Sequence, residues 1–307
     1  MKSKILFTTG AFGILLMMAG QLSFAVNDTF VKLAVQNIKV DSSIFSVIFT
    51  RGSITTLLLG LYLLFIEKKN IISIFTIKSF HIRGLYEVLT ALFFFTALIL
   101  LPISEVYTLL MTNPFFVTIF AFLFLKEKVG ARRWTAVLIG FVGVVVVINP
   151  QDFDFNFIFM LPIISAIFLT IRDIATKSLA TRSNNVEITF ITALLITISA
   201  GLASIYFGYH VTINEAPHIL ISSVFVLFGY LFSVMTVYYA PLSLTASARY
   251  SVIIFGIIFG YFILNEVPST NMIIGAIIIT LSGLFVIKRE KEICLLYTSD
   301  AADEERG

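Results

Sequence analysis

The sequence predicts an all-α membrane protein with ten transmembrane helices, arranged as two inverted repeats of five helices. The first observation behind this prediction is composition, because the 307 residues are 58% hydrophobic and only 13% charged, with a mean hydropathy of +1.00. Soluble domains are about 45–50% apolar. The second observation is that apolar runs of roughly 18–23 residues recur along the chain, each long enough to cross a ~30 Å hydrocarbon layer as a helix. Helices are expected because hydrocarbon offers no partner to backbone N–H and C=O groups.

The third observation is an internal repeat. Residues 101–150 consist of two apolar runs joined by a short basic connector, and the same plan returns at residues 240–290. The two segments align at a spacing of about 139 residues, which indicates one half-length unit used twice. The matching pairs are Pro102 and Pro241, Ser104 and Ser243, Leu125 and Leu264, and Glu127 and Glu266.

Ten apolar runs define the expected spans in chain order. The first run follows Lys2 and Lys4 and also fits a cleaved signal peptide that ends near Ala25. We favour a permanent span because the helical pattern continues through Asp28 and has a counterpart in the second half. The spans are expected at approximately residues 6–26, 44–66, 84–101, 103–125, 134–149, 157–176, 186–207, 218–239, 242–264 and 271–288.

The distribution of lysine and arginine predicts the orientation. If the N-terminus is cytoplasmic, the cytoplasmic connectors receive most of the basic residues, including those of the 126–133 connector, whereas the outer side receives little beyond Lys32 and Lys39. This bias places both termini in the cytoplasm of a bacterial inner membrane.

Five spans per half is an odd number, so the second half must enter the membrane upside down relative to the first. Inverted repeats are common in secondary transporters, because exchanging the conformations of the two halves opens a central site to each side in turn. We therefore expect one repeat at residues 6–150 and the second at residues 157–290. Residues 294–307 are small, polar and acidic beyond the first few; we expect a disordered tail, and its sequence resembles translated cloning or adapter read-through.

Charged residues inside the apolar runs are functional candidates, because a charge at mid-bilayer costs at least about 2.5–3.5 kcal/mol. Asp28 and Arg51 lie in neighbouring spans, where they can neutralise each other. The alternative is a structural pair between Asp28 and Lys32, four residues apart on one helix face and repeated as Asp173 and Lys177.

Other charged residues lie closer to the ends of the spans. Arg172 and Asp173 are placed where they can reach water by snorkelling, which favours a structural role. Glu87 is expected near the interface, beside Tyr86. Glu105 opens the fourth span, where the helix dipole favours a carboxylate.

Polar residues in the fourth and ninth spans predict the walls of a central cavity. The fourth span carries Tyr107, Met111 and Asn113 before the helix-disturbing Pro114, and the matching stretch of the ninth span carries Arg249. Tyrosines suit a polar ligand because they combine an aromatic body with a hydrogen-bonding tip. The candidate binding residues are Tyr86, Glu105, Tyr107, Met111, Asn113, Arg249 and Tyr250. Glycines at 140, 143, 275 and 283 are expected to let helices approach closely.

The segment PISEVYTLLMTNPFFVTIFAFLFLKEKVGARRW, followed by GFVGVVVVINP, resembles the first EamA-type repeat of the drug/metabolite transporter superfamily. Residues 240–290 resemble the second repeat, and the likeness covers roughly residues 8–288. The resemblance implies a ten-helix carrier that works by alternating access, with a cavity between the halves lined partly by helices four and nine. The second repeat departs from the first where Val252 and Ile253 replace Asn113 and Pro114, so the kink expected from Pro114 need not recur in span nine.

These observations predict a secondary transporter of a small polar metabolite, such as an amino acid or related zwitterion, driven by protons or by exchange. Asp28, Glu87 and Glu105 are the candidates for proton coupling, and Arg249 for holding an anionic group of the cargo. The alternatives are a multidrug or cation exporter, an intramembrane enzyme and a non-transporting scaffold. Neither a metal nor a cofactor nor a nucleic-acid partner is expected, since Cys294 is the only cysteine and the three histidines lie in or beside connectors. The partners are the lipid bilayer and the small-molecule substrate, and both a monomer and a homodimer are compatible with the sequence.

Overall fold

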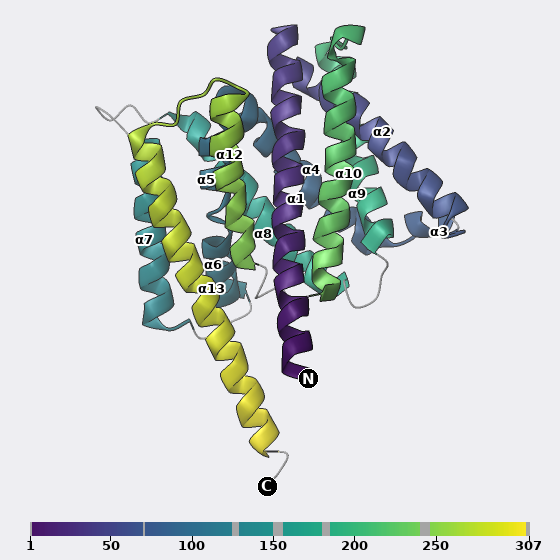
Figure 1. The fold of residues 1–307 in the computed structure, drawn as a ribbon. Helices are drawn as coiled ribbons and strands as arrows, with labels where there is room; N and C mark the ends of the chain where they lie inside the picture. The colour runs from purple at the N-terminus through teal and green to yellow at the C-terminus, as the bar shows by residue number, and fades with distance from the viewer. Residues whose placement is uncertain are drawn as a thin grey trace.

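The computed structural model describes residues 2–69, 71–124, 129–149, 156–179, 185–239 and 246–304. These residues form helices joined by short connectors (Figure 1). The helices are α1 (Lys2–Ile38), α2 (Ser43–Phe65), α3 (Ile71–Phe75), α4 (Lys78–Leu100), α5 (Ile103–Leu110), α6 (Asn113–Phe124), α7 (Ala131–Ile148), α8 (Met160–Leu179), α9 (Asn185–Phe207), α10 (Ala216–Tyr239), α12 (Ser251–Phe262) and α13 (Thr270–Glu304). Three short 3₁₀ turns are η1 (Phe157–Phe159), η2 (Ile213–Glu215) and η3 (Ala246–Tyr250).

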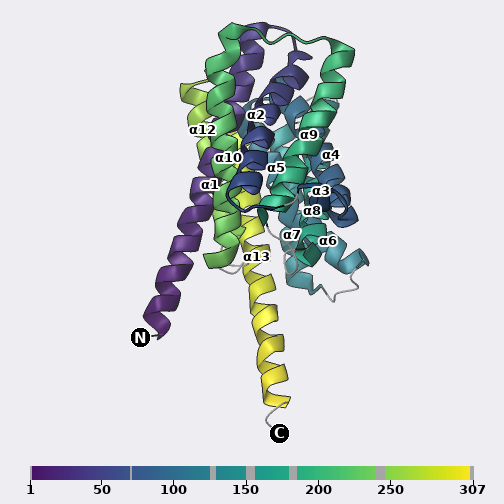
Figure 2. The same cartoon turned by 90° about the vertical axis from the view of Figure 1, so that its right-hand side faces the viewer.

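Ten apolar segments correspond to the ten predicted spans. Within the described part of the chain, nine helical segments are long and apolar enough to cross a membrane, and the shorter apolar segment Ala248–Phe262 supplies the tenth. The predicted fold class, an all-α membrane protein of about ten helices, is therefore confirmed. Figures 1 and 2 show the N-terminus and the C-terminus at the same end of the molecule, as an even number of spans requires.

Equivalent helices of the two halves pack against each other reciprocally. The first span of each half contacts the third span of the other half, so α1 packs on α10 and α4 packs on α8. The second, fourth and fifth spans pair with their own counterparts, as α2 with α9, α5 with α12 and α7 with α13. This exchange pattern is the one that two halves related by a pseudo-two-fold axis produce.

The fourth span is broken where the sequence carries proline. α5 ends at Leu110 and α6 begins at Asn113, because Pro114 lacks an N–H and its ring crowds the carbonyl of Leu110. The ninth span has no proline at the equivalent position. It changes from the 3₁₀ turn η3 to the helix α12 between Tyr250 and Ser251, the repeat equivalents of Met111 and Thr112, without any proline.

Glycines form a close seam between α7 and α13. A Cβ atom at Gly275 would lie 2.7 Å from the carbonyl oxygen of Gly143, closer than side chains tolerate. A Cβ atom at Gly140 would meet the ring of Phe115, and one at Gly283 would meet the hydroxyl of Tyr250. The prediction that these glycines allow close helix packing is confirmed.

The last helix is longer than the sequence suggests. α13 continues to Glu304, through the segment expected to be a disordered tail. The segment contains no glycine or proline before Gly307 and includes alanine, leucine and glutamate, which favour helix.

Candidate functional site

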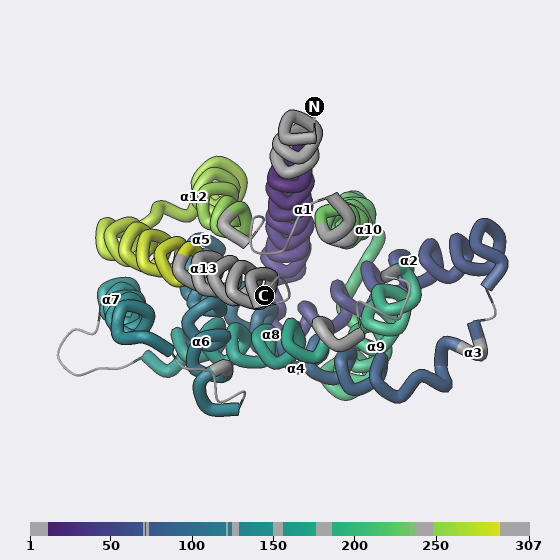
Figure 3. Tube along the Cα trace, turned by 90° about the horizontal axis from the view of Figure 1, so that it is seen from below, coloured from purple at the N-terminus to yellow at the C-terminus, as the bar shows by residue number. Residues whose placement is uncertain are grey.

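A cavity of about 340 Å³ lies between the two halves. Seen from the end that carries the termini, α1 stands across from α4 and α8 (Figure 3), and all three helices line the cavity. Its volume falls in the usual range of small-molecule sites, roughly 300–1,000 Å³. The remaining lining residues come from α2, α5, α9, α10, α12, η3 and the α5–α6 connector. No residue of α6, α7 or α13 lines it within the described ranges.

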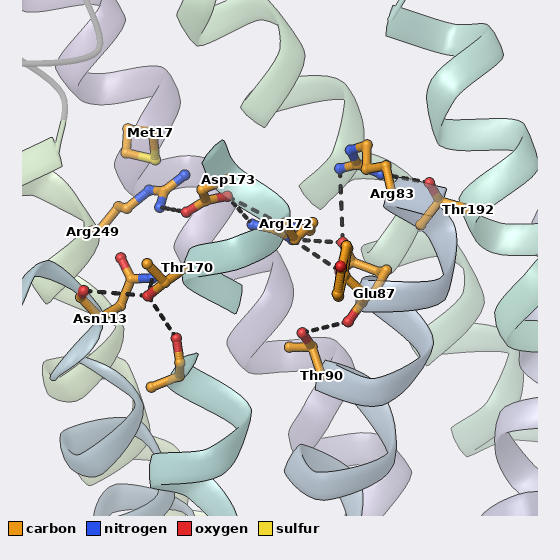
Figure 4. Close-up of polar contacts among 12 residues, drawn as sticks. Met17, Arg83, Glu87, Thr90, Asn113, Thr170, Arg172, Asp173, Thr192 and Arg249 are labelled. Carbon is orange, nitrogen blue, oxygen red and sulfur yellow. Dashed lines mark hydrogen bonds and ion pairs between the residues drawn. The ribbon is translucent and has the colours of Figure 1, made fainter. Parts of the chain in front are cut away.

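One side of the cavity carries a chain of alternating charges (Figure 4). Arg172 donates from Nη1 to both carboxylate oxygens of Glu87, at 2.9 and 2.8 Å, and from Nη2 to Oδ1 of Asp173 at 2.6 Å. Asp173 also accepts from Nη1 of Arg249 at 3.2 Å. At the other end, Nη2 of Arg83 lies 3.7 Å from Glu87. The chain therefore joins α4, α8 and η3, which belong to both halves.

Two side chains of this network, expected near the ends of their spans, are largely covered by protein. The side chain of Arg172 is only 16% exposed and that of Glu87 only 13% exposed. Buried charges in a bilayer need partners, because an unpaired one is strongly unfavourable. The alternation of three arginines with two carboxylates supplies those partners, and it leaves a formal charge of +1 beside the cavity.

A second polar group is centred on Asn27 and reaches the cavity through Asp28, Arg51 and Tyr107. The amide of Asn27 donates to Oδ1 of Asp28 at 2.7 Å and accepts from Nη1 of Arg51 at 2.7 Å. Ser222 donates to the same amide oxygen at 2.8 Å, and the hydroxyl of Tyr107 donates to Oδ2 of Asp28 at 2.8 Å. Asn27 thus bridges Arg51 and Asp28. The two charged side chains, which the sequence suggests as a neutralising pair, are connected through the amide of Asn27.

A third cluster closes the end of the molecule away from the termini. Nζ of Lys32 lies 2.5 Å from Oε1 of Glu266 and donates to the carbonyl oxygen of Leu101. The other oxygen of Glu266 accepts from the backbone N–H of Ile103 at 2.8 Å, and Glu105 lies within electrostatic range. The proposed pair between Asp28 and Lys32 is therefore wrong, because Lys32 has a carboxylate partner from the opposite half.

The cavity is most accessible at the end that carries the termini. The side chains of Asp173 and Arg249 near that end are 24% and 31% exposed. Deeper in, Asp28 is 6% exposed, Arg51 5% and Tyr107 2%. A solute therefore reaches the charged chain before it reaches the group around Asn27.

The structure brings some of the predicted site residues together and leaves others apart. Five of them line the cavity, namely Asp28, Glu87, Tyr107, Met111 and Arg249. Four others do not line it, namely Tyr86, Glu105, Asn113 and Tyr250.

The four predicted site residues that do not line the cavity make contacts elsewhere in the protein. The amide of Asn113 donates to Thr170 at 2.9 Å, and the hydroxyl of Tyr250 donates to the carbonyl oxygen of Met111 at 3.3 Å. Tyr86 is half-buried on α4. Glu105 lies beside the cluster of Lys32 and Glu266, so the structure separates it from the other two coupling candidates.

Several cavity residues were not among the predicted binding residues. They are Arg51, Arg83, Arg172 and Asp173. The signal for Arg51 is present in the sequence, since it lies in the interior of an apolar run and cannot reach the interface easily. The signal for Arg172 and Asp173 is weaker, because their place near a span end is equally typical of snorkelling side chains. Glu127, by contrast, lies outside the described residues.

Comparison with known proteins gives consistent matches. The chain is 28% identical over 194 residues to the "S-adenosylmethionine uptake transporter" of Rickettsia bellii (strain RML369-C), a match over 62% of this chain and 66% of that protein, just under two thirds of its length. It is 25% identical over 281 residues to the "Pseudopaline exporter CntI" of Pseudomonas aeruginosa (strain UCBPP-PA14), covering 91% and 97% of the two chains. It is also 29% identical over 196 residues to the "Riboflavin transporter" of Rhizobium johnstonii (strain DSM 114642 / LMG 32736 / 3841), covering 62% and 63%.

The fold and the family are also matched. A solved structure described only as "Crystal structure of protein" superposes with a TM-score of 0.58 and covers 92% of this chain and 99% of its own, at 16% identity, which shows the fold alone. The model of the EamA-like transporter family matches residues 11–149 and 156–288, which together make up most of the chain. This multi-pass membrane protein belongs to the EamA-like transporter family.

Proposed function

We propose that the protein is a secondary transporter of a small zwitterionic metabolite, such as an amino acid or a compound with an amino-acid head group, in a bacterial inner membrane. The observation that carries this proposal is the cavity between the halves, which presents both arginines and carboxylates. Charged groups in a bilayer interior are typical of substrate and ion pathways. A solute that carries both signs of charge finds a partner for each at this site. The names of the relatives cover both uptake and export, so the family leaves the direction of transport open.

Alternating access follows from the inverted halves. In this structure the cavity is reached from the end that carries the termini, which is cytoplasmic by the distribution of Lys and Arg. The cluster of Lys32 and Glu266 closes the other end. The conformation is therefore inward-open, and an exchange of the conformations of the two halves produces the outward-open state.

Asp28 is the proton-coupling residue in this proposal. Its carboxyl lines the cavity, is buried, and accepts hydrogen bonds from Asn27 and Tyr107. Both oxygens of Glu87 already accept hydrogen bonds from Nη1 of Arg172, and Arg83 lies beside the same carboxylate. A carboxyl without a salt-bridge partner at hydrogen-bond distance is the better site for a proton that binds and leaves.

The test is transport by purified protein in liposomes. The liposomes are loaded with a bacterial metabolite extract, and mass spectrometry measures which compounds leave when an inward proton gradient or an outside exchange partner is imposed. A second set of liposomes receives a defined panel of α-amino acids, each paired with the amine left after loss of its carboxylate. The panel includes S-adenosylmethionine and its decarboxylated form.

We expect zwitterions to leave protein-containing liposomes at least ten times faster than protein-free ones. Arg172→Gln, which breaks the charged chain, is expected to reduce that transport at least tenfold, whereas Arg132→Gln on the first turn of α7 retains it. The proposal fails if no compound of either set moves faster with the protein than without it.

A multidrug cation exporter is the second candidate, favoured by the aromatic surroundings of Asp28. The rings of Phe94 and Tyr107 stack with centroids 6.1 Å apart beside the same cavity, and aromatic faces attract organic cations. Ethidium efflux from the same liposomes separates the two functions. Efflux of ethidium without movement of zwitterions supports the exporter.

A further inference from the structure

We propose that Arg51, and not Arg249, binds the carboxylate of the transported compound. This inference rests on the proposed function and adds the residue that recognises one end of the cargo. Arg51 is the ninth residue of α2, lines the cavity and is 5% exposed. The carbon of its guanidinium lies 5.3 Å from the centroid of the Phe95 ring, which supports one face of the plane. The edge of the plane is left for hydrogen bonds.

The hydrogen bonds of Arg51 are incomplete. Nη1 donates to the neutral amide oxygen of Asn27, whereas Nε is buried and has no partner in the structure. A guanidinium has five N–H donors and a fixed charge. A buried donor without an acceptor costs about 1–3 kcal/mol, and more when the group is charged. Arg51 is therefore the group in this cavity that gains most from an incoming anion.

The other cavity arginines already have carboxylate partners. Arg172 is shared between Glu87 and Asp173, Arg83 lies beside Glu87, and Arg249 is paired with Asp173. A cargo carboxylate at Arg249 would compete with Asp173, whereas at Arg51 it would replace no carboxylate hydrogen bond. The planar fork of arginine matches the two oxygens of a carboxylate.

The surroundings of Arg51 favour a zwitterion over a phosphate. Asn27 connects Arg51 to Asp28, so a unit positive and a unit negative charge lie side by side. Each oxygen of Asp28 accepts one hydrogen bond in the protein, from Asn27 or Tyr107, and a carboxylate offers about four acceptor sites. An ammonium group can therefore bind Asp28 while the carboxylate of the same molecule binds Arg51. A phosphate dianion would meet one positive charge and be repelled by Asp28.

The paired panel of amino acids and their decarboxylated amines tests this assignment directly. The quantity measured is the ratio of transport rates of the two members of each pair, in liposomes that contain wild-type protein, Arg51→Gln or Arg51→Lys. Arg133→Gln is the matched control, because Arg133 is equally buried, its Nε also lacks a partner, and it does not line the cavity. Phosphoserine and serine form an additional pair that separates phosphate from carboxylate recognition.

We expect the wild-type protein to move the carboxylated member of at least one pair ten times faster than the amine. Arg51→Gln is expected to bring this ratio close to one by slowing the amino acid, Arg51→Lys to give an intermediate ratio, and Arg133→Gln to keep the wild-type ratio. If Arg51→Gln does not fold, the assignment is still tested by the ratio of amino-acid to amine transport in the wild-type protein and in Arg51→Lys.

Four results overturn the assignment. Three are an unchanged ratio in Arg51→Gln, wild-type transport of amines as fast as amino acids, and transport of extract compounds without transport of any carboxylated panel member. The fourth is faster movement of phosphoserine than of serine, which points to phosphate. In each case the transport function stands, because failure of that function requires that nothing moves in either set of liposomes.

Discussion

Asn27 separates two charges that would otherwise pair directly. Its amide group has one donor side and one acceptor side, and the structure uses both, toward Asp28 and toward Arg51. A direct salt bridge would hold each charge in its most stable state and reduce its affinity for a cargo. The bridging amide keeps both groups positioned while leaving acceptor sites on Asp28 and donors on Arg51.

Asp28→Asn is expected to abolish the effect of a pH gradient on transport and also to slow exchange. The substitution keeps the size of the side chain but removes both the proton that we propose to be carried and the charge that we propose to bind the ammonium group of the cargo. Gradient-driven accumulation should fall to the level measured without a gradient, whereas exchange at equal pH on both sides should fall but stay above that of protein-free liposomes. Transport by liposomes with and without an imposed gradient measures both.

Glu215→Gln is the control for this prediction. Glu215 is also a carboxylate with a low exposed fraction, but it accepts from Thr212 at the start of η2 and does not line the cavity. A gradient response that persists in Asp28→Asn would exclude Asp28 as the coupling group.

At the closed end, one ion pair joins the two halves. Lys32 at the end of α1 belongs to the first half, and Glu266 in the α12–α13 connector belongs to the second. Glu266 also holds the N–H of Ile103 at the start of α5. In the alternating-access cycle that we propose, the cavity opens on this side only if these elements separate, so the ion pair is expected to break in each cycle.

Glu266→Gln is expected to favour the outward-open state, because the remaining amide forms a weaker bond with Lys32. A cysteine at position 111, which lines the cavity, reports access in a Cys294→Ser background. An impermeant maleimide added outside intact cells should label Met111→Cys at least three times faster when Glu266→Gln is present. Equal labelling rates would show that the pair does not hold this end closed, and Glu215→Gln is again the matched control.

The change from the 3₁₀ turn η3 to the helix α12 in the ninth span coincides with contacts to neighbouring elements. In the fourth span the sequence explains the break through Pro114. In the ninth span nothing in the local sequence predicts it, yet the 3₁₀ turn η3 ends at the equivalent position. Tyr250 is buried there and its hydroxyl donates to Met111 on the other half. Packing between the halves, rather than a proline, accompanies the change of helix type at this position.

Over the whole molecule, the number and order of the spans could be predicted because each depends on a local apolar run. The pairing of charges could not, since it depends on residues far apart in the chain. A local rule pairs Asp28 with Lys32, four residues away, whereas the structure pairs Lys32 with Glu266. The same limit applies to Arg249, because the sequence does not reveal that Asp173 pairs with it.

The orientation of the molecule leads to a prediction about its surface. Both termini are expected in the cytoplasm, and the α9–α10 connector with Tyr209 is expected outside. In a Cys294→Ser background, Tyr209→Cys should react with an impermeant maleimide added to intact cells, because this side chain is exposed. Glu67→Cys, in the connector after α2, should react with the maleimide only after the membrane is made permeable. The opposite pattern would reverse the orientation and place the opening of the cavity outside.

The close packing of α7 against α13 bears on which residues can change without disturbing the fold. The close approach of Gly143 and Gly275 restricts substitution at the seam, yet no described residue of either helix lines the cavity. Mutations that alter cargo recognition and mutations that alter this scaffold therefore fall on separate helices. A lineage can exchange side chains on α1, α2, α4 and α8 without disturbing the seam. Substitutions of cavity residues on those four helices are therefore expected to leave the packing of α7 against α13 unchanged.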